Sequence, residues 1–381
     1  MLRLAPALLL FFVSGFAALL YQVIWQRLLV FFSGADVHSA TIVVAAFMAG
    51  LGCGSFAGGH VADRVSRRTS LALFACAEVA VAVFGFFSSR LFYDVLYTRL
   101  AHVDLGTVPT ALLLFAALLW PTFLMGASLP LLSRGLTRDV DGAASTIGLL
   151  YALNTLGAAA GAFGATWILL PQAGLEGSLR YAALLNAACA AGAIPLAWRG
   201  GDFAGTRPAR APRVSAAVPA DAGGISRWSL LFAMSGFVGL SLELVWFRLL
   251  GVMLKSTSLT FGTLLAVYLA GLAAGSVAGS ALSPRVRRPA VWFLLLQAGA
   301  GAYAVAGLAL FIRGLDGTGP IAWFHDYFQQ YEGVDLRVAL AYWAGAPVDP
   351  GSAPGDVLRL YVGLPLLLIG PPTVMAGMSF P

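Results

Sequence analysis

Charged side chains are scarce in this sequence: Asp, Glu, Lys and Arg together make up 10% of its 381 residues. Soluble domains carry about a quarter of their residues as charges, so the composition excludes an ordinary soluble protein. Hydrophobic residues reach 59%. Apolar runs of about 20 residues, long enough to span a bilayer, recur along the chain. The sequence therefore indicates an all-α polytopic membrane protein whose first partner is the lipid bilayer.

Cysteine and lysine are rarer still. The three cysteines, Cys53, Cys76 and Cys189, lie inside apolar runs without metal-ligand spacing, so neither a disulfide framework nor a metal site is expected. Of the 23 basic residues one is a lysine, Lys255, and arginine carries the net charge of +6. In a membrane protein such arginines mark cytoplasmic loops. We expect no cofactor and no nucleic-acid partner.

Catalytic motifs are also missing. The four histidines are scattered along the chain, and no strand-following glycine-rich nucleotide loop with a downstream acidic residue is present. We therefore assign no catalytic residue. An enzyme with a site inside the membrane remains the weakest of the alternatives, and the question of enzymatic activity stays open.

One sixteen-residue stretch occurs twice. Residues 14–29 read SGFAALLYQVIWQRLL, and residues 235–250, which lie 221 positions later, read SGFVGLSLELVWFRLL, with half of the positions identical. A repeat of this kind has to be recognised before a fold is assigned. It predicts that the chain contains two copies of one membrane unit.

About ten transmembrane helices are expected. Their approximate ranges are 5–31, 39–60, 71–90, 108–131, 146–170, 179–197, 229–252, 258–282, 290–312 and 357–380. We predict a first six-helix repeat over 1–198, a cytoplasmic linker over 199–228, and a second repeat of four helices over 229–381. The linker is rich in Arg, Pro, Ala and Gly, a composition typical of flexible connections.

Arginine placement predicts the orientation. One set of alternate loops holds fourteen basic residues, and the opposite set holds six. The positive-inside rule then places the N-terminus in the cytoplasm. With ten spans the C-terminus is cytoplasmic as well, and the expected location is the cell (inner) membrane.

The second span of each copy carries a glycine every four residues. These glycines are Gly50, Gly54 and Gly58 in the first copy and Gly271, Gly275 and Gly279 in the second. Four-residue spacing places them on one helix face, where a neighbouring backbone can approach closely. The face serves either plain packing, which we favour, or sliding during a rocking motion.

A short loop after the second span has a recognisable pattern. It consists of Gly59, Asp63, Arg64, Arg67 and Arg68, and it resembles the loop signature G-x-x-x-D-R-x-G-R-R of the major facilitator superfamily, with Ser66 in place of the second glycine. Asp63 is expected to accept from an arginine or to cap a helix N-terminus. The alternatives are a conformational latch and plain topology arginines.

A third landmark closes each copy. Residues 121–130 read PTFLMGASLP and residues 372–381 read PTVMAGMSFP, at an offset of 251. About 30 residues are therefore added between spans nine and ten, in the aromatic segment 313–356, which we expect at the membrane interface. No second copy of spans five and six follows. We expect a C-terminal truncation, with an open groove in the second bundle.

Together these motifs support a resemblance. The SGF stretch, the GLxxGSxAG helix, the PTFLMGASLP landmark and YALNTLG at 151–157 resemble the membrane region of the fused spermidine synthase-like proteins. In that family a major-facilitator-like membrane region precedes a cytoplasmic aminopropyltransferase domain. The resemblance implies a transporter-like module that handles a small cationic solute such as a polyamine. The alternative is a membrane anchor or scaffold for an aminopropyltransferase domain supplied elsewhere.

The candidate site consists of polar and aromatic residues inside the spans. Glu243 and its repeat equivalent Gln22 lie three residues before Trp246 and Trp25, and Glu78 is a second intramembrane carboxyl. A carboxylate beside an aromatic face can hold an organic cation by charge and cation–π attraction.

A structural explanation for the same residues stays open, and it is the one we favour. In it, Arg27 or Arg248 pairs with Glu78 or Glu243 inside the bundle, or the carboxyls are simply protonated. The two arginines could instead gate a cavity. The polar residues Asn154 and Asn186 are expected to form interhelical hydrogen bonds rather than to bind a ligand.

Overall fold

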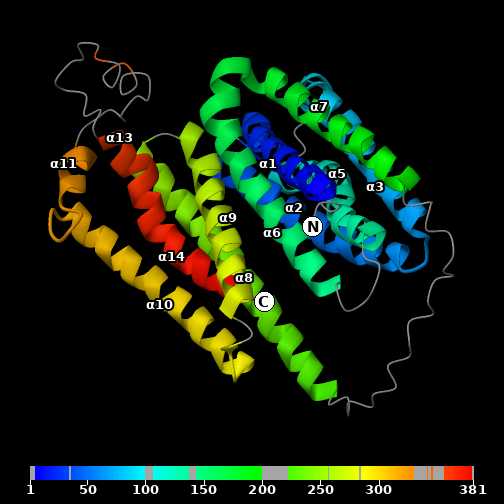
Figure 1. Ribbon diagram of the computed structural model, residues 1–381. Coiled ribbons are helices and arrows are strands. Elements are labelled where there is room, and N and C mark those ends of the chain that lie inside the picture. Colours follow the sequence, from blue (N-terminus) through cyan, green and yellow to red (C-terminus); the bar gives the residue numbers. More distant parts are fainter. Residues whose placement is uncertain are drawn as a thin grey trace. The chain divides into compact units, whose positions relative to one another are not determined.

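The computed structural model describes residues 5–33, 36–98, 106–136, 143–199, 222–255, 257–282, 285–329, 341, 345 and 356–379. In these ranges the chain is helical and contains no β-strand (Figure 1). Nine helical segments among them are long and apolar enough to cross a membrane. The expected all-α polytopic membrane fold is confirmed.

The first part of the chain forms the following elements: α1 Ala5–Ser33, α2 Asp36–Ala62, α3 Arg67–Ser89, η1 Arg90–Tyr97, α5 Thr107–Leu136, α6 Ala143–Gly164, η3 Ala165–Leu169 and α7 Leu170–Arg199. The second part forms α8 Ala222–Leu254, α9 Thr257–Leu282, α10 Pro289–Leu315, α11 Trp323–Gln329, α13 Asp356–Leu358, η6 Arg359–Gly363 and α14 Leu364–Met378. The η elements are π-helical turns that continue their neighbours.

Spans five and six appear as one continuous helical stretch, Ile147–Trp198. The break between them is a single residue, Gly174, with φ 66° and ψ −172°. That backbone conformation is accessible to glycine and strained for other residues. The chain therefore changes direction at Gly174 without the separate loop that we expected between 170 and 179.

The chain divides into two compact units. Unit 1 comprises Met1–Gly157 and Gln172–Leu244, and unit 2 comprises Ala158–Pro171 and Val245–Pro381. Most of the expected linker 199–228 lies outside the described residues, but its last part, from Ala222 on, is already helical and belongs to α8. The predicted division into two repeats remains a prediction.

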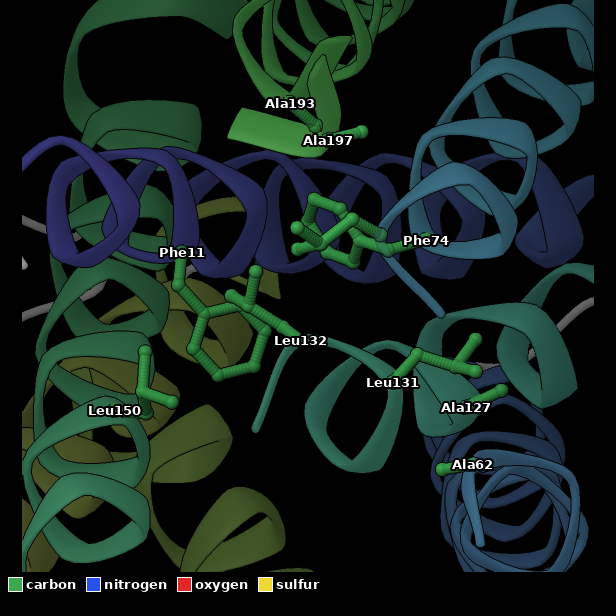
Figure 2. Close-up of a cluster of buried hydrophobic side chains, with 10 residues drawn as sticks. Phe11, Ala62, Phe74, Ala127, Leu131, Leu132, Leu150, Ala193 and Ala197 are labelled. Carbon is green, nitrogen blue, oxygen red and sulfur yellow. The ribbon is translucent and has the colours of Figure 1, made fainter. Parts of the chain in front are cut away.

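Unit 1 has a core to which six helices contribute (Figure 2). Its buried members come from α1, α2, α3, α5, α6 and α7: Phe11, Ala62, Leu71, Phe74, Ala127, Leu131, Leu132, Leu150, Ala193 and Ala197. The small members lie on α2, α5 and α7, where they let the helices come close, and the large ones fill the space between. This core fixes the helices that carry Glu78 and its neighbours.

Glycines set the closest helix contact in unit 1, between α2 and α5. A Cβ atom added to Gly50 would overlap the Thr122 side chain, and one added to Gly54 would overlap the Phe123 carbonyl oxygen. On the facing helix, a Cβ atom at Gly126 would overlap the backbone of Leu51. The predicted packing face is therefore confirmed for this pair.

Unit 2 contains the matching contact between α9 and α14, which run side by side (Figure 1). A Cβ atom at Gly271 would overlap Thr373, one at Gly275 would overlap the Val374 carbonyl oxygen, and one at Gly377 would overlap the backbone of Leu272. The residues on α9 lie 221 positions after their counterparts on α2, and the residues on α14 lie 251 positions after their counterparts on α5.

The threonines of the two landmarks also act alike. The Thr122 hydroxyl donates to the Leu118 carbonyl at 2.8 Å. The Thr373 hydroxyl donates to the Ile369 carbonyl, likewise at 2.8 Å. Each hydroxyl thus bonds to a carbonyl of its own helix while its side chain meets a glycine of the partner helix. The Thr122 hydroxyl also reaches the Ala46 carbonyl of α2 at 3.1 Å.

The aromatic segment after α10 packs against protein where the structure describes it. Phe324 and Tyr327 of α11 are fully buried, and Phe324 contacts Phe311 of α10 at 5.5 Å between ring centroids. Lys255 Nζ donates to the Tyr327 carbonyl at 2.8 Å and lies 4.5 Å from the centre of the Tyr327 ring. Both rings belong to the core of unit 2. Tyr331, a further aromatic residue of the segment 313–356, lies outside the described residues.

These contacts change the titration of two groups outside the spans. Burial lowers the pKa of Lys255 from its usual value. Burial, and next the neighbouring Tyr361, raises the pKa of the Tyr327 hydroxyl to about 12. Lys255 holds α11 against the start of α9 through its contacts with the carbonyl and the ring of Tyr327.

Candidate functional site

Glu78 is the centre of a buried polar cluster in unit 1. The Ser14 hydroxyl of α1 donates to Glu78 Oε1 at 2.7 Å, and the Asn186 amide of α7 donates to Oε2 at 2.6 Å. The Ser128 hydroxyl of α5 is a third hydrogen-bond partner. Glu78 itself lies on α3 and is 2% exposed. Four helices therefore meet at one carboxyl group.

Two further polar side chains stand beside this cluster. Tyr21 on α1 and Cys189 on α7 both lie near the Glu78 carboxyl. The Cys189 thiol donates to the Leu10 carbonyl at 3.2 Å. In the described part of the chain, Tyr21 Oη and Asn186 Oδ1 are buried without a hydrogen-bond partner. The cluster thus contains more buried oxygens than its own donors satisfy.

Glu243 is buried in α8 in a different way. It is 4% exposed, and among the described residues its carboxyl has no hydrogen bond and no ion pair. Trp246, one turn further along the helix, is 6% exposed and contacts Tyr268 of α9 at 6.3 Å between ring centroids. A buried carboxyl without a partner is costly in a membrane, and such groups usually serve a function.

Trp25 and Gln22, the sequence counterparts of Trp246 and Glu243, are packed more completely. Trp25 is fully buried and donates from Nε1 to the Ser88 hydroxyl at 3.0 Å. Its ring stacks on Tyr21 at 4.9 Å and meets the edge of Phe84 at 5.5 Å. Gln22 is 3% exposed. Trp25 is therefore part of the core of unit 1, since its indole face and its N–H group are both in use.

The proposed ion pairs join Glu78 or Glu243 to one of two arginines. The oxygens of Glu78 are bonded to serine and asparagine side chains, and Glu243 has no partner among the described residues. Arg27 is half-buried and Arg248 is exposed. The Arg–Glu alternative stays a prediction, and protonation is the other structural explanation.

The loop after α2 is organised by residues other than Asp63. The Ser66 hydroxyl caps α3 by accepting from the Thr69 N–H at 3.2 Å, which is the usual role of an N-terminal serine. Asp63 is exposed, and the expected cap of α3 by this residue is wrong because Ser66 occupies that place. The expected contact of Asp63 with an arginine stays a prediction.

The arginines around this loop hold the end of α2 instead. Arg64 donates to the His60 carbonyl at 2.8 Å, and Arg134 of α5 donates to the Ala62 carbonyl at 3.3 Å. Cations at a helix C-terminus satisfy its free carbonyls and oppose its dipole. Arg68 is exposed, and Gly59 has open space where a Cβ atom would stand.

The second copy has a neutral counterpart of the Glu78 cluster. Gln297 of α10, which we matched with Glu78, donates to the Ser379 hydroxyl at 2.9 Å. Ser379 is the landmark equivalent of Ser128, since it lies 251 residues later. Gln297 and Ser379, which sequence matching pairs with Glu78 and Ser128, thus form an amide–hydroxyl contact within unit 2.

Sequence reasoning found Glu78 and missed its hydroxyl partners. Ser14 and Ser128 are identical in both copies, as Ser235 and Ser379, and this identity was the signal available. The interpretation of the two asparagines as interhelical links is confirmed, because the Asn154 amide donates to the Phe11 carbonyl of α1 at 3.0 Å.

Comparisons of the chain with protein-family models, with curated proteins and with solved structures found no match.

Proposed function

We propose that this protein is a transporter-like membrane module that binds a small organic cation, with Glu243 as the counter-charge. The buried carboxyl of Glu243, which has no hydrogen bond or ion pair within the described part of the chain, carries the proposal. Burying a charged side chain at the middle of a membrane costs roughly 2.5–3.5 kcal/mol by insertion scales. A cationic ligand would offset that cost.

The aromatic neighbour of Glu243 supports the same ligand class. Trp246 follows Glu243 by one helical turn, and residues three apart lie on the same side of a helix. The face of an indole attracts ammonium groups, most strongly where water is excluded. A polyamine offers several such groups on an apolar chain, so one can pair with the carboxyl while its methylenes contact the ring.

The family assignment belongs to this proposal as well. We propose that the chain is the membrane region of a spermidine synthase-like fusion protein, built from two major-facilitator-like repeats. The glycine and threonine contacts of α2 with α5, and of α9 with α14, support it because they recur at the two sequence offsets.

Spermidine binding by the purified protein in detergent tests the proposal. Glu243→Gln removes the charge and retains the shape, and we expect it to weaken binding about tenfold or more, the effect of losing one charged hydrogen bond. Glu176→Gln is the matched control, since Glu176 is exposed and pairs with Arg180 on α7. The control should bind like the parent protein.

The alternative function predicts a different result. If Glu243→Gln and the control bind spermidine equally, or if the parent does not bind it, the solute-binding proposal is wrong. The protein would then be better explained as a membrane anchor for an aminopropyltransferase domain.

A further inference from the structure

We propose that Glu78 is an intramembrane proton-binding site, which holds one proton when the four helices around it are packed and releases it when they separate. The site lies within unit 1, and its ligand is H⁺. It stands independently of the cation proposed for Glu243, because the two carboxyls have different surroundings.

The first argument is the charge around the carboxyl. The hydrogen-bond partners of Glu78 are neutral: a serine from α1, a serine from α5 and an asparagine from α7. Among the residues that the structure describes, the titratable groups that face it are Tyr21 on α1 and Cys189 on α7. Neither brings a positive charge. An ionised Glu78 would therefore leave one uncompensated negative charge inside the membrane, and a single proton removes it.

The second argument is the geometry of the two shortest contacts. The oxygen–oxygen distance from Ser14 to Glu78 Oε1 is 2.7 Å, which suits a hydroxyl bonded to a carboxylic acid in either direction. The contact of Asn186 with Oε2 is 2.6 Å, which is short for a neutral N–H···O bond and ordinary for an O–H···O bond. The distance therefore suits an acid O–H that donates to the Asn186 amide oxygen.

The third argument is the unpartnered amide oxygen. Asn186 is 2% exposed, and its Oδ1 atom has no partner among the described residues. Half a turn of the amide brings Oδ1 to the place where Nδ2 now contacts Glu78. There it would accept the proton of the acid. An amide can thus serve both states of the carboxyl, as a donor to the ionised form and as an acceptor from the neutral form.

The fourth argument comes from the second copy. Gln297, the equivalent of Glu78, contacts Ser379 with a group that cannot titrate at neutral pH. A neutral amide therefore suffices to link the two helices at this position. The carboxyl at Glu78 adds the ability to gain and lose a proton.

Infrared spectroscopy of the purified protein in detergent tests this directly. A protonated carboxyl buried in protein has a C=O stretching band that shifts when H₂O is exchanged for D₂O. We expect the parent protein to show such a band at neutral pH, to lose it reversibly at alkaline pH, and to lack it in Glu78→Gln. Glu78→Asp should retain a titrating band, and Glu243→Gln should retain the Glu78 band.

Three outcomes would overturn the proposal. The first is a spectrum of Glu78→Gln that equals the parent spectrum. The second is a Glu78 band that stays unchanged at every pH at which the protein remains folded, which would mark a permanently neutral structural acid. The third is loss of the band on addition of Na⁺ at constant pH, which would identify a metal-cation site. A failure of spermidine binding would affect none of these readings.

Discussion

Serine hydroxyl groups are hydrogen-bond partners of buried polar side chains that link the helices of unit 1. Ser14 donates a hydrogen bond to Glu78, Ser88 accepts one from Trp25, and Ser39 accepts one from Gln26 at 3.0 Å. A serine is small enough to let two helices pack closely and can both donate and accept a hydrogen bond. Each of these bonds joins two helices, so their loss should loosen the bundle.

Ser88→Ala tests one such link. The substitution leaves the buried Trp25 N–H without an acceptor, and we expect it to lower the free energy of unfolding by about 1–2 kcal/mol. Thermal unfolding in detergent, followed by circular dichroism, measures the effect. Ser55→Ala is the control, because Ser55 of α2 is exposed and makes no hydrogen bond in the described chain. Equal melting temperatures of the two variants would contradict the role of Ser88.

Residue types in the site could be predicted from the sequence, but their surroundings could not. Intramembrane Glu78 and Glu243 are conspicuous in apolar runs, and repeat matching linked Gln22 with Glu243. Burial of Trp25 depends on Ser88 and Phe84 of α3, which lie about 60 residues away. No spacing within the first span reveals such partners, so the sequence could not show that Trp25 packs in the core of unit 1.

At the scale of elements, apolar length predicted the helices closely. The expected spans 258–282 and 290–312 correspond to Thr257–Leu282 and Pro289–Leu315. Hydropathy marks where a helix must be dehydrated, and the helix then continues into the polar flank until a cap or a glycine stops it. That is why observed helices are mostly longer than predicted, and why the bend at Gly174 replaced an expected loop.

The glycine faces permit a paired test at this scale. Gly54→Ala would place a methyl group against the Phe123 carbonyl oxygen, and we expect overpacking to cost about 1–3 kcal/mol of stability. Gly52→Ala on the same helix faces open space and should change stability little. Chemical unfolding of both variants in detergent gives the comparison. A Gly54→Ala protein as stable as Gly52→Ala would show that α2 and α5 are not in close contact.

At the scale of the whole molecule, the distribution of arginines predicts the membrane orientation, which no internal contact fixes. The residues that flank α10 are well placed to test it, because one helix separates them. Arg287 precedes α10, Asp316 follows it, and both side chains are exposed. The positive-inside rule puts Arg287 in the cytoplasm and Asp316 outside.

Labelling of single cysteines in intact cells decides between the two orientations. Asp316→Cys should react with a membrane-impermeant thiol reagent, and Arg287→Cys should react only after the cells are opened. Cys53, Cys76 and Cys189 are first replaced by serine or alanine, so that the introduced thiol alone is measured. The reverse labelling pattern would place the N-terminus outside. Because α10 is a single continuous helix, labelling of both positions in intact cells would mean that α10 does not cross the membrane at all.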